Sequence, residues 1–522
     1  MPQSRLLVLG FDAMDVELVR RWAAAGYLPT FRRLFESAAW TDYLNPPEHT
    51  SGNLWPSIHS GVGPLRHDFN YAVMFCPDSY RTRMGAAGDL NVEPFWKWFA
   101  QSGRRIVVVD APLTIPDPEC GGKQVWGWGT HTSPWHGSSV PRGLLSELVT
   151  QFGPHPAPDC HDYSTRTESL LRFTSSLRTG IERRTSIFRS LLAARDWDLF
   201  YGVYTEAHCA GHLMWHLEDE SHPQHTQEQL AIVGHALREI YASLDGALAE
   251  LLACADPHTI SVVFLPDGMG PNYHGAHLFS AFLERFNQRW GENATSGASR
   301  PSQNSPFDAL WKASVGVMPA GFRARVKLLL PSGLRRWVAT QRRLNPGRLS
   351  RLPAFWLPQD GISLVRVNLL GREMKGRIRP NEEYRRYIDA LTTELLQVAN
   401  AGNGQPAVER IFRADQQVDP MTIGSGPDLI AWWSKSAPIR EIRSATLGTI
   451  SGEFAEIPTG EHVMRGMLAL CHPLIQGGRR TIPGASALDI PATLCELAGI
   501  QPGITLEGAS RCGDLAPSIG QG

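Results

Sequence analysis

Short apolar runs that alternate with longer helical patterns constrain this chain more than any other feature. The runs have strand length and are rich in β-branched or apolar residues: Leu6–Phe11, Arg105–Asp110, Leu199–Tyr204 and Ser261–Leu265. Helices are predicted where apolar residues recur at steps of three and four, at 16–36, 168–195 and 227–255. This alternation predicts an α/β fold with a central, mostly parallel sheet and helices on both of its faces.

Three of the predicted strands end beside polar residues suited to metal binding. Asp12 follows the first run, Glu206, His208 and His212 follow the third, and Asp267 follows the fourth. In parallel α/β sheets, ligands bind beyond the carboxyl ends of the strands. His208 and His212 are four residues apart, so a helix would place both imidazoles on one face, where they could share a metal ion.

Two further segments carry polar groups. The Pro46–Ser57 loop supplies the adjacent hydroxyls of Thr50 and Ser51, and Gly460-Glu461-His462 precedes another predicted strand. Each signal is weak when taken singly. An Asp after a strand is commonly a helix cap, and a pair of histidines four apart is more often two surface or capping side chains.

The composition changes near residue 287. Residues 309–359 hold ten Lys or Arg and no Asp or Glu, which indicates either a solvated basic face or a lid that attracts an anionic substrate. A small α/β unit is expected at 361–415, and the sheet pattern resumes near Pro427–Ile430. These features predict a core formed by 1–286 and 416–522, interrupted by an inserted cap region at 287–415.

Charge and hydropathy exclude several classes of protein. A net charge of −1 and a pI near 7.0 argue against general nucleic-acid binding. No apolar run approaches the roughly 18 residues that span a membrane, and the N-terminus lacks the features of a signal peptide. The eight Cys contain no CxxC pair, which favours reduced thiols and a cytoplasmic location. The oligomeric state cannot be derived from these patterns.

Taken together, the polar segments resemble the type I phosphodiesterase/nucleotide pyrophosphatase family of the alkaline phosphatase superfamily. The similar blocks occur in the family's order: Leu7–Asp12, Gly26–Phe31, the segment from Ser51 to His67, Glu206–Trp215, Asp267–Met269, Asn368–Glu373, Gly426–Leu429, His462 to Gly466, and Leu488–Gly499. The resemblance implies an alkaline-phosphatase-like fold with an inserted cap.

The resemblance also implies a two-metal site, usually of zinc, in which a Ser or Thr hydroxyl attacks phosphorus. Asp12 matches a metal-binding Asp of the family, and His212 and His462 match two of its metal-binding histidines. The nucleophile position falls on Ser51, or on Thr50 if the loop is shifted by one residue.

Two departures from the family pattern affect the metal ligands. His208 stands where the family usually has Asp, and Pro266-Asp267-Gly268-Met269 stands where it usually has Asp-His-Gly-Met. One usual ligand is therefore missing, whichever way the segment is aligned. Three nearby residues could compensate: Glu206, His274 and His277.

Asn368 and Arg372 are further candidates, in this case for binding substrate. Arg372 could hold a phosphate through two hydrogen bonds, although a structural ion pair with Glu373 is equally compatible with the sequence.

The sequence therefore predicts a metal-dependent hydrolase of phosphate esters or diesters with a small anionic substrate. Ser51 is the expected nucleophile, Asp12 and Asp267 are expected to hold one ion with it, and three histidines the other: His208, His212 and His462. Zinc suits the histidines, and manganese is the alternative. Two other readings stay open: a single-metal, three-histidine enzyme that transfers a non-phosphate group in biosynthesis, and a binding protein without catalysis.

Overall fold

The computed structural model describes residues 5–70, 73–85, 89–129, 137–294, 346–357, 359, 361–452 and 458–517. Most of the predicted basic lid, 309–359, lies outside these residues. Among the described residues, no helix combines the length and apolarity that crossing a bilayer requires. All eight cysteines are described and none forms a disulfide, while the cytoplasmic location stays a prediction.

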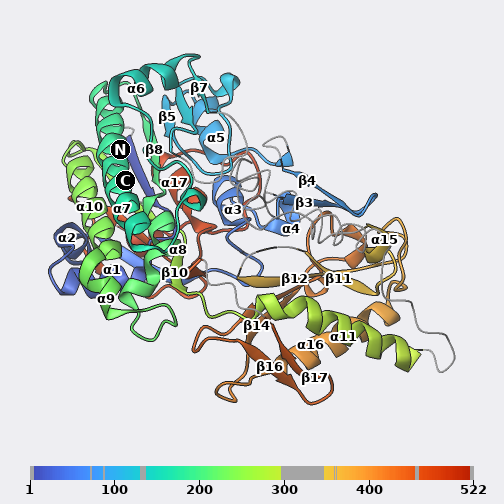
Figure 1. The fold of residues 1–522 in the computed structure, drawn as a ribbon. Helices are drawn as coiled ribbons and strands as arrows, with labels where there is room; N and C mark the ends of the chain where they lie inside the picture. The colour runs from blue at the N-terminus through green and yellow to red at the C-terminus, as the bar shows by residue number, and fades with distance from the viewer. Residues whose placement is uncertain are drawn as a thin grey trace.

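A nine-stranded sheet, together with the helices that cover it, forms the larger part of the molecule (Figure 1). Its centre is β1 (Arg5–Phe11), which pairs in parallel with β8 (Leu199–Tyr204) on one side and β9 (Thr259–Leu265) on the other. The order is β20-β2-β19-β9-β1-β8-β5-β6-β7. The outer strands are β2 (Ala39–Leu44), β5 (Ile106–Val109), β6 (Lys123–Trp126), β7 (Ser138–Val140), β19 (Arg465–Cys471) and β20 (Gly478–Arg479). The strand predictions at 6–11, 105–110, 199–204 and 261–265 are thus confirmed to within a few residues.

Helices cover both faces of this sheet, as predicted, because successive strand residues alternate between two apolar cores. In β1, Leu7 and Leu9 face one core, and Leu6 and Val8 face the other. The first face is covered by α1 (Val16–Ala24), α2 (Pro29–Ser37), α6 (Leu144–Phe152), α7 (Thr167–Ala193), α8 (Glu206–Glu218), α9 (Gln227–Val233) and α10 (Ala236–Leu252). The second face is covered by α3 (Leu54–Ser60), α5 (Phe95–Gln101) and α17 (Asp489–Ala498).

Two of the predicted helices are each divided in two. The segment 16–36 forms α1 and α2, because Pro29 has no backbone N–H and starts a new helix at its first position. The segment 227–255 forms α9 and α10, which are separated at Gly234, where φ is +71°.

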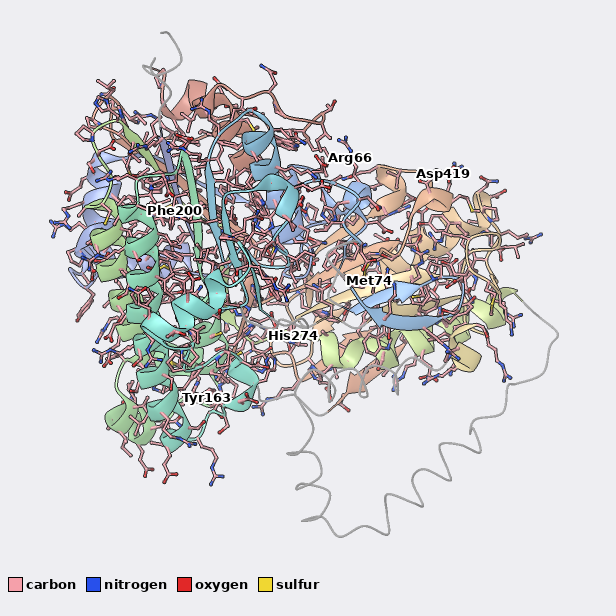
Figure 2. All side chains as sticks on the ribbon, turned by 90° about the horizontal axis from the view of Figure 1, so that it is seen from above. Arg66, Met74, Tyr163, Phe200, His274 and Asp419 are labelled. Atoms are coloured by element: carbon pink, nitrogen blue, oxygen red, sulfur yellow. The ribbon has the colours of Figure 1, made fainter. Side chains whose placement is uncertain are left out.

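A second, four-stranded antiparallel sheet lies beside the first (Figure 2). Its order is β11 (Ala354–Leu357), β12 (Ile362–Val367), β15 (Leu429–Trp433) and β14 (Val408–Arg413). The helices α11 (Ala276–Ala294) and α16 (Glu382–Leu396) pack on it around a third apolar core.

The expectation that the main sheet resumes near 427–430 is wrong, because β15 pairs with β12 and β14 of the second sheet. The chain returns to the main sheet only at β19. The division of the chain into a core and an insertion at 287–415 stays a prediction.

Smaller elements complete the described structure. Two strand pairs are β3 (Val73–Cys76) with β4 (Arg81–Met84), and β10 (Gly268–Pro271) with β18 (Gly460–Val463). A three-stranded sheet contains β13 (Ala399–Asn400), β16 (Glu441–Ser444) and β17 (Gly448–Ser451). Three short helices are α4 (Pro64–His67), α15 (Pro346–Leu349) and α18 (Cys512–Leu515).

A buried ion-pair network ties α7 to the end of β8. The guanidinium of Arg184, fully buried, donates to Asp110 Oδ2 at 2.6 Å and to Glu206 Oε1 at 2.9 Å. His155 Nε2 lies 3.2 Å from the same Glu206 oxygen. Burial raises the pKa of Glu206, but Arg184 and His155 together lower it to about 2. The network fixes the point at which α8 begins.

We predict that Arg184→Met destabilises the protein by about 3–5 kcal/mol, because two buried carboxylates lose their cation. Arg189→Met on the same helix is the matched control, since its pair with Glu250 is exposed and should contribute little. Urea denaturation at neutral pH measures both variants. The ion pair stabilises the fold fully above pH 4.5, the ordinary pKa of Glu206, and this stabilisation is lost as the pH falls toward 2. The difference between wild type and Arg184→Met should therefore shrink in acid, and a constant difference would contradict the assignment.

Candidate active site

The three strand ends singled out in the sequence meet at one edge of the main sheet, as predicted. β9, β1 and β8 are neighbours, so the residues that follow them converge. Asp12 is held at the end of β1 by its backbone N–H, which donates to the carbonyl of Tyr204 at 2.8 Å. The α8 helix starts directly after β8, and Asp267 follows β9.

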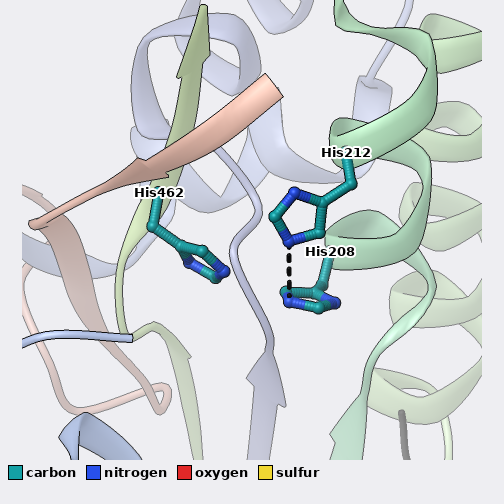
Figure 3. A group of neighbouring side chains, drawn as sticks. All are labelled: His208, His212 and His462. Carbon is teal, nitrogen blue, oxygen red and sulfur yellow. Dashed lines mark hydrogen bonds between the residues drawn. The ribbon is translucent and has the colours of Figure 1, made fainter. Parts of the chain in front are cut away.

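His208 and His212 lie on one face of α8, one turn apart, and their Nε2 atoms are 3.2 Å apart (Figure 3). His212 Nδ1 donates to the carbonyl of Gly460 at 2.9 Å, so a neutral ring presents its Nε2 lone pair to the site. Burial and the neighbouring His462 lower the pKa of His212 to about 4, which keeps this ring neutral.

His462 reaches the same point from β18, which pairs with β10 and sets Met269 opposite His462. Its ring centre is 4.9 Å from that of His208 and 5.1 Å from that of His212. The carboxylate of Asp267 accepts a hydrogen bond from His462 Nδ1 at 2.7 Å. The other ring nitrogen is thereby left for the site. The structure thus brings together all three predicted histidine ligands, within 4.8 Å of one another.

The three histidines fit a zinc ion. With Zn–N bonds of about 2.0–2.1 Å, tetrahedral geometry separates two ligand nitrogens by about 3.3 Å. The observed 3.2 Å between His208 and His212 agrees with this value. Two of the rings are also held from behind, by the carbonyl of Gly460 and by the carboxylate of Asp267, as is usual for metal-binding histidines. Three protein ligands leave a fourth position open.

The carboxylates of Asp12 and Asp267 form a second, less complete candidate site. Asp12 Oδ1 accepts a hydrogen bond from Trp55 Nε1 at 2.8 Å, and Asp267 Oδ1 accepts one from the backbone N–H of Ala13 at 3.2 Å. Burial, together with the nearby charge of Asp267, raises the pKa of Asp12 to about 7.

This pair does not belong to any group of three or more potential ligands in the described part of the chain. The two such groups found there are the three histidines and the consecutive residues Asp159–His161. Pro266, beside Asp267, has no side-chain ligand atom, and its carbonyl accepts a hydrogen bond from Asn45 Nδ2. The two carboxylates and a Ser51 hydroxyl alone are a poor fit for a tightly bound zinc ion.

Ser51 and Thr50 are in different surroundings. Ser51 is half-buried and lines a small pocket with six side chains and one glycine: Gln359, Gly361, Ile362, Trp432, Glu461, His462 and Met464. Thr50 is 1% exposed, and its backbone N–H is bonded to Asn53 Oδ1. Ser51 therefore shares a pocket with a metal-ligand candidate, whereas Thr50 is not among the residues that line it.

The residues proposed to compensate for the missing ligand do not join the histidines. Glu206 is engaged by Arg184 and His155. Neither His274 nor His277 belongs to a ligand group in the described residues. His274 lies where the two large sheets meet (Figure 2), and its Nδ1 accepts from the backbone N–H of Ala276.

The substrate-binding assignment of Arg372 and Asn368 is not supported, because both side chains have structural roles. Arg372 donates through both terminal nitrogens to Asp428 and through Nε to Glu373 at 2.9 Å. Its remaining N–H groups donate to the carbonyls of Pro420 and Val367, so no donor is left for a phosphate. Asn368 is fully buried and bonded to the hydroxyl of Tyr80.

Sequence reasoning assigned no role to Glu461 or Lys435, which flank the site. Lys435 Nζ donates to the backbone carbonyls of Glu461 and His462. Burial lowers the pKa of Lys435 to about 8. Glu461 could have been noticed beside His462, but no local pattern points to Lys435, which follows β15 of the second sheet.

The chain is similar to known proteins both in sequence and in fold. Residues 6–309 match the family described as type I phosphodiesterase / nucleotide pyrophosphatase. A phosphonoacetate hydrolase from Sinorhizobium meliloti 1021, crystallised with phosphonoacetate, has a TM-score of 0.51 at 12% identity, over 94% of this chain and 95% of that one. The alkaline phosphatase PafA has a TM-score of 0.53 at 10% identity, over 98% of each chain.

No curated protein matches this chain by sequence. At these identities the solved structures show the shared fold, and the family match carries the assignment. Because that match covers more than half of the chain, the chain belongs to the type I phosphodiesterase / nucleotide pyrophosphatase family, whose members are metal-dependent phosphohydrolases of the alkaline phosphatase superfamily.

Proposed function

We propose that this protein hydrolyses phosphate esters or diesters, with Ser51 as the nucleophile beside a zinc ion held by His208, His212 and His462. One observation carries the proposal: Ser51 and His462 line the same pocket, and His462 is hydrogen-bonded to Asp267 at the end of β9. A small anionic substrate fits such a site, since the phosphonoacetate hydrolase of the same fold is seen with an anionic ligand.

Bound zinc would supply a Lewis acid that stabilises negative charge on oxygen near the attacked phosphorus. The protein's own groups orient the metal-binding histidines and can transfer a proton. Asp267 fixes the ring of His462 through the 2.7 Å hydrogen bond, and Gly460 fixes His212. Asp12, with its pKa raised to about 7, can exchange a proton near neutral pH. The hydroxyl of Ser51 loses its proton and attacks phosphorus, while the bond from phosphorus to one alcohol breaks and that alcohol leaves with a proton. Water then cleaves the bond between phosphorus and the serine oxygen, which releases the phosphate monoester of a diester substrate, or phosphate from a monoester, and restores the hydroxyl.

A second candidate is an enzyme with one metal ion that transfers a non-phosphate group. The observation that favours it is the incomplete carboxylate pair, because Asp267 faces His462 as a hydrogen-bond acceptor. The open position of a three-histidine zinc site can also polarise a carbonyl. Family membership favours phosphate chemistry and argues against the binding-protein reading.

We predict one tightly bound zinc ion per chain, measured by plasma mass spectrometry on untagged protein after gel filtration. His212→Ala should lose this ion, and Asp267→Asn should weaken its binding about 10- to 100-fold, because His462 loses its orienting carboxylate. His235→Ala is the matched control, since His235 is partly exposed and pairs with Glu218. Two tightly bound ions would show that Asp12 and Asp267 complete a second site, and no binding at all would refute the metal centre.

We predict that Ser51→Ala lowers the hydrolysis of an aryl phosphodiester at least about a thousandfold, as expected when a nucleophile is removed. Thr50→Val should retain activity within about tenfold, because Thr50 does not line the pocket. Steady-state kinetics on zinc-loaded protein measures both. The opposite ranking would assign the nucleophile to Thr50. Full activity of both variants would exclude a covalent intermediate in which Ser51 or Thr50 carries the phosphoryl group.

A further inference from the structure

Glu461 carries a buried carboxylate oxygen that the described protein leaves unbonded. The side chain is 3% exposed, and its Oε1 accepts from the backbone N–H of His462 at 2.8 Å. Its Oε2 is buried and has no hydrogen-bond partner. Leaving such an acceptor unsatisfied costs about 1–3 kcal/mol, so this oxygen is matched to a donor from outside the protein.

The surrounding backbone holds this carboxylate in place. Gly361, at φ +73°, packs so closely that a Cβ there would lie 2.5 Å from Glu461 Cγ. Lys435 donates to the main-chain carbonyl of Glu461 at 3.0 Å. Lys435 therefore bonds to the backbone of β18 and not to the carboxylate, and the Oε2 atom is left as a fixed acceptor.

The same carboxylate lines the pocket that contains Ser51 and His462. Gln359 also lines it, and neither end of that buried amide has a hydrogen-bond partner. The other side chains of the lining are apolar, namely Ile362, Trp432 and Met464, and no Lys or Arg is among the lining residues of this described pocket. This wall is thus suited to a hydrogen-bond donor and unsuited to a second anionic group.

We propose that Glu461 recognises a hydrogen-bond donor, an ammonium or hydroxyl group, on the part of the substrate next to the phosphate ester. The substrate class is then a phosphodiester with an amino- or hydroxy-substituted alcohol. This inference rests on the proposed function, because it takes the pocket at Ser51 as the substrate site. A site built to bond a substrate N–H or O–H discriminates strongly against an analogue that lacks it.

The test compares three esters of nearly equal shape: methyl 2-aminoethyl phosphate, methyl 2-hydroxyethyl phosphate and methyl propyl phosphate. Their binding to zinc-loaded Ser51→Ala protein is measured by titration calorimetry, so that turnover is not required. We expect the amino or the hydroxy ester to bind at least about tenfold more tightly than the propyl ester. The stronger of the two identifies the donor.

The variant Glu461→Gln, added to Ser51→Ala, should abolish this preference, because an amide N–H₂ then replaces the acceptor Oε2. Glu461→Asp retains a carboxylate and should retain part of the preference. Glu36→Gln, an exposed position on α2, is the control and should leave the ratio unchanged. Zinc content and melting temperature are measured for every variant to verify folding.

Equal binding of the three esters, or binding of none, would overturn the inference. Loss of zinc in Glu461→Gln, as in His212→Ala, would overturn it too and make Glu461 a metal ligand. Hydrolysis of an aryl phosphodiester by the wild type is scored separately, so an indiscriminate but active enzyme would leave the proposed function intact. If the wild type does not hydrolyse the aryl phosphodiester but the protein still prefers the amino or hydroxy ester, the proposed hydrolysis is refuted and the inference about Glu461 stands.

Discussion

The hydrogen bond between Asp267 and His462 is the contact on which the site depends. It joins the end of β9 to β18 across 195 residues of sequence, and it is a charge-assisted contact in a buried place. Without it, the ring of His462 would have no fixed orientation toward His208 and His212. Asp267 and α8 follow β9 and β8, which lie on either side of β1 at the same edge of the main sheet. The bond therefore fixes His462, which comes from a later part of the chain, relative to this sheet.

The same bond also determines what Asp267 contributes to the altered ligand set. Pro266 offers no side-chain ligand, and the carboxylate of Asp267 accepts a hydrogen bond from His462. Burial and the nearby charge of Asp267 raise the pKa of Asp12 to about 7. In the proposed function, a metal ion held by the three histidines would supply the positive charge that attracts the phosphodiester.

The sequence was sufficient to predict the site residues that local patterns determine. Asp12, His208, His212 and Asp267 follow strands whose order in the sheet brings them together, and helical spacing aligns the two histidines. It was insufficient where contacts between distant parts of the chain determine the role of a side chain or the partner of a strand. Arg372 is consumed by Asp428, 56 residues away, and β15 joins the second sheet although its pattern resembles any buried strand. No local pattern distinguishes these outcomes.

The arginines of the described structure that are buried beside the strands are occupied by structural partners, and in the proposed function the metal ion therefore binds the anion. Arg184 serves Asp110 and Glu206, and Arg372 serves Asp428. As proposed above, Glu461 repels anions, whereas the metal ion attracts them. A carboxylate in the pocket repels a doubly charged phosphate monoester more than a singly charged diester. The two proposals together assign separate tasks to the site: the cation attracts the phosphate, and the carboxylate of Glu461 selects among phosphate esters by accepting a hydrogen bond from a donor group.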